Sequence, residues 1–176
     1  MKQKYFLKIA MLFVIGLISN YSFGQTTVSY DFSSGGAASG LNEASPGISL
    51  DSNIGFGSFK NSGSSNPGIF SSQLRLYQNA TKGGSIIIYA LNGVTITDVT
   101  VTASSRTGPA GYSVDGGATT NLSGSSPYTI SGISATSQVE FFQRDASSSN
   151  RIYVDSFQVT YTSGGPAAPG ITLGTV

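Results

Sequence analysis

The dipeptide Asn92-Gly93 constrains the fold of this chain more than any other feature of its sequence. Apolar runs rich in β-branched residues flank it on both sides, within residues 84–104. A two-residue turn of type I′ requires positive φ at both central positions, and Asn-Gly meets this requirement better than most pairs. The pattern therefore predicts a β-hairpin centred on this dipeptide, in the middle of an all-β domain.

The register of that hairpin predicts a β-bulge in its second strand. Pairing outward from the turn would place Tyr89 opposite Ile96. The spacing of apolar residues then slips by one position at Asp98, and Val99 follows. An extra residue at Thr97-Asp98 would return Val99 to the buried face, since a slip of one residue otherwise moves every side chain to the other face.

Short apolar runs bounded by turn residues recur along the rest of the chain, which is typical of an all-β protein. They cover residues 27–32, 47–50, 54–59, 74–77, 112–114, 127–131, 139–144 and 152–161. The last run shows the same slip in apolar spacing, at Asp155, so we expect a second bulge there. No long stretch has a period of 3.6 residues. The sequence predicts an antiparallel β-sandwich of jelly-roll type.

Residues 1–24 have the pattern of a bacterial signal peptide. Lys2, Lys4 and Lys8 precede an apolar run over residues 9–18, which is shorter than the roughly 20 residues that a membrane span needs. Small residues at Ser22 and Gly24 suit cleavage before Gln25. We expect a secreted or cell-surface protein with no membrane span in the mature chain. The alternative is an N-terminal membrane anchor.

The remaining boundaries follow from composition. We expect the β-sandwich domain to cover residues 26–162 and a linker rich in Gly and Pro to cover residues 163–170. Residues 171–176 alternate like the opening of another strand. The sequence therefore predicts neighbouring domains C-terminal to Val176.

Composition excludes several classes of function. The chain contains no Cys and no His, so catalysis by a Ser-His-Asp or Cys-His arrangement and the usual zinc sites are excluded. Only two glutamates, Glu43 and Glu140, follow the signal peptide, and nothing in the sequence pairs either with an aspartate. After cleavage, six basic residues stand against eight acidic ones. We expect neither enzymatic activity nor binding to nucleic acid, which needs a basic surface.

Five side chains are candidates for ligand binding. They occupy the outward positions of two predicted strands, at Arg75, Tyr77, Glu140, Phe142 and Arg144. If the two strands are neighbours, these residues form one face with aromatic surface and forked hydrogen-bond donors, which suits recognition of a glycan. The alternative is an outer sheet face held together by Arg–Glu pairs across the strands.

Calcium is the metal that the composition allows. Asp31, Asp51, Asn53 and Asp155 supply the oxygen ligands that calcium prefers. No EF-hand spacing is present. The alternative is that these Asp and Asn side chains cap turns. We expect no other cofactor.

Four segments together carry a resemblance to a known class of domain. They are LRLY at residues 74–77, GSI at 84–86, GVTITDV at 93–99 and RIYVDSFQVTY at 151–161. Across residues 30–161 the chain resembles β-sandwich accessory domains of secreted, multidomain bacterial surface proteins, similar to galactose-binding-like and carbohydrate-binding-module jelly rolls. It departs from typical sugar-binding modules in lacking Trp, their commonest stacking platform.

The resemblance implies a secreted, non-catalytic accessory module whose partner is a polysaccharide or a cell-surface glycan. Two alternatives stay open at this point. One is a structural spacer or adhesin-like domain without a small ligand. The other is the N-terminal domain of an extracellular hydrolase or nuclease whose catalytic part lies downstream.

Overall fold

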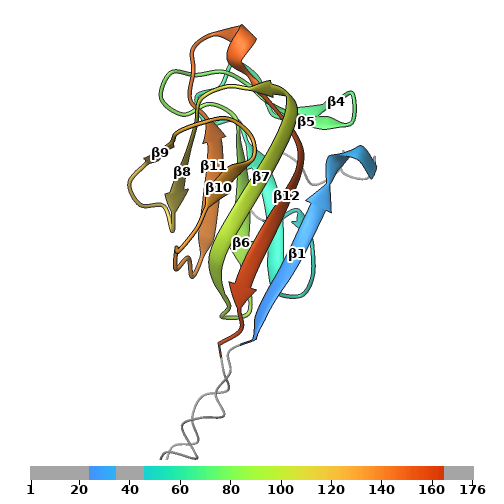
Figure 1. Ribbon diagram of the computed structural model, residues 1–176, viewed down its shortest axis with the longest axis vertical. Coiled ribbons are helices and arrows are strands. Elements are labelled where there is room, and N and C mark those ends of the chain that lie inside the picture. The colour runs from blue at the N-terminus through green and yellow to red at the C-terminus, as the bar shows by residue number, and fades with distance from the viewer. Residues whose placement is uncertain (1–23, 35–45, 165–176) are drawn as a thin grey trace, which may run out of the picture.

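The protein is a sandwich of two β-sheets (Figure 1). The computed structural model describes residues 24–34 and 46–164. They form two antiparallel sheets of six strands each, with one hydrophobic core between them. The predicted all-β antiparallel sandwich is therefore confirmed. Among these residues, no helix has the length and apolar character needed to cross a membrane.

Sheet A is organised around its longest pairing, between β7 and β12. Its strands are β1 (Gln25–Asp31), β4 (Gly68–Phe70), β5 (Gln73–Leu76), β7 (Thr95–Thr107), β10 (Tyr128–Ile130) and β12 (Ile152–Thr162). The order is β10-β7-β12-β5-β4, and β1 also pairs with β12. One edge of β12 thus pairs with β7 along its length. The other edge pairs with β5 near the start of β12 and with β1 toward its end.

Sheet B covers the other side of the core. Its strands, in spatial order, are β2 (Ile48–Ser49), β3 (Ile54–Phe59), β6 (Ser85–Ala90), β11 (Gln138–Gln143), β8 (Ala110–Val114) and β9 (Thr120–Leu122). Two short 3-10 turns, η1 (Phe32–Ser34) and η2 (Ser148–Asn150), complete the described secondary structure. Consecutive strands from β5 to β8 alternate between the sheets, so their connections cross from one layer to the other.

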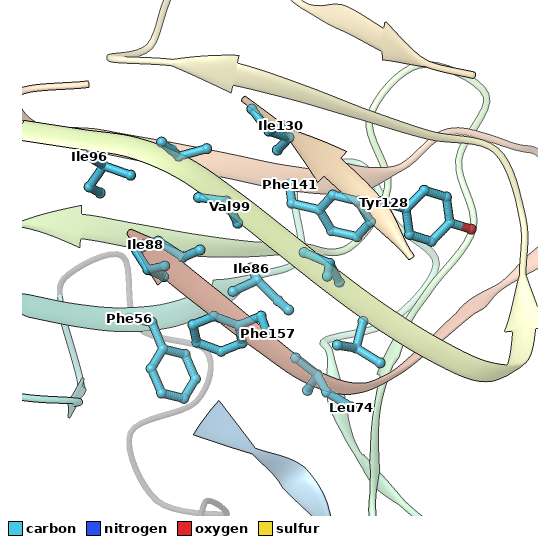
Figure 2. Packing of buried hydrophobic residues seen from close by; sticks show 14 of the residues in the cluster. Phe56, Leu74, Ile86, Ile88, Ile96, Val99, Tyr128, Ile130, Phe141 and Phe157 are labelled. Atoms are coloured by element: carbon cyan, nitrogen blue, oxygen red, sulfur yellow. The ribbon is translucent and has the colours of Figure 1, made fainter. Parts of the chain in front are cut away.

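Four aromatic rings form the centre of the core. Phe56 of β3 and Phe157 of β12 face each other across the two layers, with ring centroids 4.9 Å apart and an interplanar angle of 76° (Figure 2). Tyr30 and Phe32 pack against both of them, with centroid distances from 4.7 to 6.1 Å. Edge-to-face and tilted pairs at these distances add stability beyond the apolar area that they bury.

The Asn92-Gly93 turn forms, but the predicted hairpin does not. Asn92 has φ of 51° and Gly93 of 74°, and the Val94 N–H donates to the Leu91 carbonyl at 3.2 Å. These are the features of a tight turn with positive φ at both central residues. The turn nevertheless joins β6 of sheet B to β7 of sheet A. It is an arch between the two layers, and the prediction that β6 and β7 pair is wrong.

Long-range pairing explains why the arch replaces the hairpin. Both edges of β6 are already paired, with β3 on one side and β11 on the other. Tyr89 consequently lies opposite Gly55 and Gln138, while Ile96 lies opposite Tyr161. The side chains of Ile88 and Ile96 are both fully buried in the core. The two strands therefore bury their apolar faces against each other across the core instead of sharing an edge.

Both predicted bulges are confirmed, in strands that pair with each other. The register between β7 and β12 shifts near the start of β7 and leaves Thr97 as an extra residue beside Asp98. A second shift leaves Asp155 as the extra residue of β12. Val99 returns to the core, where it is 1% exposed. The slips in apolar spacing thus mark true bulges, although the strand opposite Thr97 is β12 and not β6.

Several predicted segments lie outside the described residues. They are the signal peptide up to residue 23, the linker from residue 165 and the segment 171–176. These predictions therefore stay untested by the structure.

We expect replacement of Gly93 by Val to destabilise the domain by about 1–2 kcal/mol, the usual penalty for an L-residue with left-handed backbone. An added Cβ would meet no atom within 4 Å, so the effect arises from the backbone conformation and not from a clash. Chemical denaturation measures the change. Gly68→Val, at another glycine whose Cβ would meet no atom within 4 Å but whose φ is not positive, is the control. Equal stability of the two variants would contradict a strained turn at Gly93.

A second prediction concerns the acid stability of the turn after β8. The carboxylate of Asp115 accepts hydrogen bonds from the backbone N–H groups of Thr136, Ser137 and Gln138 at 2.8–3.0 Å. Burial alone would raise the pKa of Asp115, but these hydrogen bonds outweigh it and hold the pKa well below its usual range. A lowered pKa in the folded state stabilises the domain above the unfolded pKa of about 3.9, and this contribution is lost as the pH falls below that value.

We therefore expect Asp115→Asn to destabilise the domain at pH 7 and to have a smaller effect at pH 3. Asn tolerates the positive φ of 50° at this position, so the substitution leaves the backbone unstrained. Unfolding curves of both proteins at the two pH values give the comparison. A difference in stability that stays constant between pH 7 and pH 3 would contradict the role of the ionised carboxylate.

Candidate functional site

The structure divides the five predicted ligand-binding residues between the two outer faces of the sandwich. Arg75 and Tyr77 belong to β5 and the residue after it, in sheet A. Glu140 and Phe142 belong to β11, and Arg144 follows it, in sheet B. The strands β5 and β11 are not neighbours, so the single face that would join all five residues does not form.

The two predicted residues in β11, Glu140 and Phe142, are buried and already have partners within the protein. Both carboxylate oxygens of Glu140 are occupied, Oε2 by the Lys82 ammonium and Oε1 by the Asn61 side-chain amide at 2.8 Å. Phe142 is fully buried, and the Lys82 Nζ lies 5.1 Å from its ring centroid. A buried ring offers no stacking surface to a sugar, and a paired carboxylate offers no acceptor.

Arg144 lines a shallow cavity of about 330 Å³ at the β8–β9 end of sheet B. The cavity is lined by Pro109, Ala110, Asn121 and Leu122 as well as Arg144. The Arg144 Nε donates to the Thr81 carbonyl at 3.1 Å, which fixes the side chain against the neighbouring loop. Among the described residues that line the cavity, Arg144 is the one charged group and none is aromatic.

The sheet A residues, in contrast, belong to a larger group of side chains on the outer face of that sheet. We call it the arginine–aromatic cluster, and it consists of Phe70, Arg75, Tyr77, Arg151 and Tyr153. Register explains the grouping, because Tyr153 of β12 lies directly opposite Arg75 of β5. Phe70 comes from β4, the next strand toward the edge.

Cation–π contacts hold the cluster together. The Arg75 guanidinium carbon lies 3.8 Å from the centroid of Phe70, 4.9 Å from that of Tyr153 and 5.6 Å from that of Tyr77. The Arg151 guanidinium carbon lies 4.8 Å from the Tyr77 centroid. All four distances are within the range of about 6 Å over which a cation is attracted to the ring. Two positive charges are thus arranged among three aromatic rings.

A tight hairpin at the sheet edge presents Phe70 to solvent. Ser71 and Ser72 form the two-residue loop between β4 and β5, with φ of 50° and 61°. Positive φ is uncommon for residues other than Gly, Asn and Asp, so the serines hold this turn at some conformational cost. Phe70 remains 52% exposed at the base of the loop. Phe70, next to this strained turn, is therefore the most accessible side chain of the cluster.

The four predicted calcium ligands do not gather in one place. Among the described residues, no group of three or more Asp, Glu, His or Cys side chains is placed to hold a metal ion. Asp31 accepts from the Ser33 N–H at 2.7 Å, and Asp51 accepts from the N–H groups of Asn53 and Ile54 at the same distance. Asp31 and Asp51 thus cap turns, which is the alternative that the sequence left open for them.

Two of the same four residues also have partners in the sheets. Burial alone would raise the pKa of Asp51, but the hydroxyl of Tyr161 and the backbone of Asn53 and Ile54 donate hydrogen bonds that lower it. The Asp155 carboxylate accepts from the side chains of Gln73 and Ser104. Calcium binding stays an untested prediction.

Three members of the cluster, Phe70, Arg151 and Tyr153, were not among the residues that the sequence predicts. Alternation in residues 152–161 does place Tyr153 on the outward face, and this is the signal that could have found it. Nothing in the sequence pairs that strand with residues 74–77.

Comparison of the chain with protein-family models gives no match, and comparison with curated proteins gives none either.

Proposed function

We propose that this protein is a secreted, non-catalytic binding module that recognises a glycan through the arginine–aromatic cluster. The observation that carries the proposal is the exposed Phe70 ring beside two arginines that are held among aromatic rings. Sugar rings bind to proteins by stacking on aromatic side chains and by hydrogen bonds from planar, forked donors. Both kinds of group are present in the cluster, and Phe and Tyr take the place of the absent Trp.

The place of the cluster in the fold supports this proposal. Tyr153 lies at the start of β12, whereas Thr162 at its end pairs with Gln25 at the start of β1. At roughly 3.3 Å per residue, β12 separates the cluster from that end of the sandwich by about 30 Å. Figure 1 shows β4 and β5 at the end of the sandwich that lies away from the start of β1 and the end of β12. The cluster therefore lies far from Gln25 and Thr162, where β1 begins and β12 ends.

A glycan microarray followed by affinity measurement tests the proposal. We expect Phe70→Ala and Tyr77→Ala to weaken binding of the selected glycan at least about tenfold, a loss of about 1.4 kcal/mol. Tyr89→Ala, a substitution on the other sheet, is the matched control and should bind like the unmodified protein. Melting temperatures confirm that the variants are folded. Binding that survives both cluster substitutions would overturn the proposal, and the absence of binding to any glycan would favour a structural spacer.

A further inference from the structure

We infer that the glycan is acidic, with carboxylate or sulfate groups that bind to Arg75 and Arg151. This inference rests on the proposed function and names the chemical class of the partner. It follows from three properties of the cluster: its charge, its hydrogen-bonding capacity and the number of its cations.

The cluster carries positive charge that the described part of the protein does not neutralise. The one ion pair found there within 4 Å joins Lys82 to Glu140, on the other sheet. Arg75 and Arg151 have aromatic and amide neighbours and, among the residues that the structure describes, no carboxylate within 4 Å. After loss of the predicted signal peptide the chain has more acidic than basic residues. A local excess of two cations on such a protein favours an anionic partner through charge complementarity.

Hydrogen bonds within the protein use only some of the N–H donors of the Arg75 and Arg151 guanidinium groups. The Arg75 Nη1 donates to the Tyr77 hydroxyl in a long hydrogen bond of 3.4 Å, and the Arg75 Nε is buried without an acceptor. The Arg151 Nε donates to the Gln78 side-chain carbonyl at 2.6 Å. The remaining terminal N–H groups of both arginines have no acceptor among the described residues. A guanidinium group binds carboxylate and sulfate oxygens in a bidentate way, with two parallel hydrogen bonds.

A polyanion of another class, a nucleic acid, is less well matched. Binding to nucleic acid requires contacts from Lys and Arg to several successive phosphates. Among the side chains that the structure describes, the cluster offers two cations, Arg75 and Arg151. Lys82 and Arg144 are associated with sheet B and are already bonded to Glu140 and to the Thr81 carbonyl. An acidic sugar needs one bidentate contact and one stacking surface, and the cluster supplies both.

Isothermal titration with polygalacturonate, with its carboxyl-reduced neutral counterpart, with chondroitin sulfate and with a single-stranded oligonucleotide tests this inference. We expect binding to at least one acidic polysaccharide, at least about tenfold weaker binding to the neutral polymer, and weaker binding at higher salt. Arg75→Gln and Arg151→Gln should each abolish the preference for the acidic form. Arg75→Lys keeps the charge but not the fork and should recover binding only in part.

Arg144→Gln, on the other outer face, is the control and should leave the affinity unchanged. Equal binding of the acidic and neutral polymers would overturn the acidic class and leave glycan recognition intact. Preferential binding of the oligonucleotide, or binding to none of the polysaccharides, would overturn both the inference and the proposed function.

Discussion

Replacing Phe157 by alanine is expected to lower the free energy of unfolding by about 3–5 kcal/mol, the range measured for large buried aromatic residues. Phe157 is 1% exposed and contacts three other rings, those of Tyr30, Phe32 and Phe56. Its removal leaves a cavity between rigidly paired strands, which cannot close because β12 is paired along both of its edges. The stability of a typical domain is only about 5–15 kcal/mol, so much of it depends on this residue.

Urea denaturation of the unmodified protein, Phe157→Leu and Phe157→Ala measures the effect. Leucine retains most of the buried volume and should cost less than half as much as alanine, because cores tolerate changes that conserve volume. Phe70→Ala, at the exposed ring of the cluster, is the matched control, and we expect its stability to change by less than about 1 kcal/mol. A Phe157→Ala variant as stable as Phe70→Ala would show that the four rings are not the centre of the core.

The second large effect concerns the ion pair between Lys82 and Glu140. The Glu140 side chain is 6% exposed and that of Lys82 is 36% exposed. Removing one partner of a buried pair leaves an uncompensated charge, which commonly costs 3–5 kcal/mol. Because water still reaches Lys82, we expect Lys82→Met to cost about 2 kcal/mol, between the roughly 1 kcal/mol that exposed pairs reach and the 3–5 kcal/mol lost when a buried pair is broken.

A double-mutant cycle separates the pair from its surroundings. Gln at position 140 can still accept the hydrogen bond from Asn61, whose Nδ2 lies 2.8 Å from the Glu140 carboxylate. The double variant Lys82→Met/Glu140→Gln buries no unpaired charge, so we expect it to be more stable than Lys82→Met alone. Denaturation curves of the four proteins give the coupling energy. If the double variant is less stable than Lys82→Met, the buried carboxylate is not the source of the loss.

The strands that alternate clearly could be predicted from the sequence, with bounds close to those observed. For example, the apolar run 54–59 coincides with β3, and residues 152–161 differ from β12 by one position. The bulges were predictable too, because a slip at Thr97-Asp98 or Asp155 is visible in the spacing of the buried residues themselves. Strands β4 and β9 have only three residues each and show no such alternation.

The pairing of strands could not be predicted, because it depends on contacts that are distant in sequence. The Asn92-Gly93 signal correctly predicts a turn with positive φ at both positions. Such a turn can connect two paired strands in a hairpin, or two strands of different sheets in an arch. The hairpin between β4 and β5 in sheet A has the two-residue loop Ser71-Ser72, which carries no such signal. The residues at a turn thus determine its local conformation. The sheet to which each strand belongs is determined by the strands that pair with its edges.

For the candidate site, too, the face on which each residue lies could be predicted, whereas the pairing of the strands could not. Alternation places Arg75 and Tyr77 on an outward face, and it places Glu140, Phe142 and Arg144 together on another. Whether these faces coincide depends on whether β5 and β11 are neighbours, and they belong to different sheets. The residues that complete the cluster, Phe70 and Tyr153, come from the strands that do pair with β5.

We propose the arginine–aromatic cluster as the binding surface of this domain. A titration of the ¹⁵N-labelled protein with trigalacturonate, followed through the backbone amide chemical shifts, locates the binding surface residue by residue. We expect the largest shifts in residues 68–78 and 151–154, around the Ser71-Ser72 hairpin and the start of β12. Shifts concentrated on β8, β9 and β11 of sheet B, or no shifts at all, would contradict it.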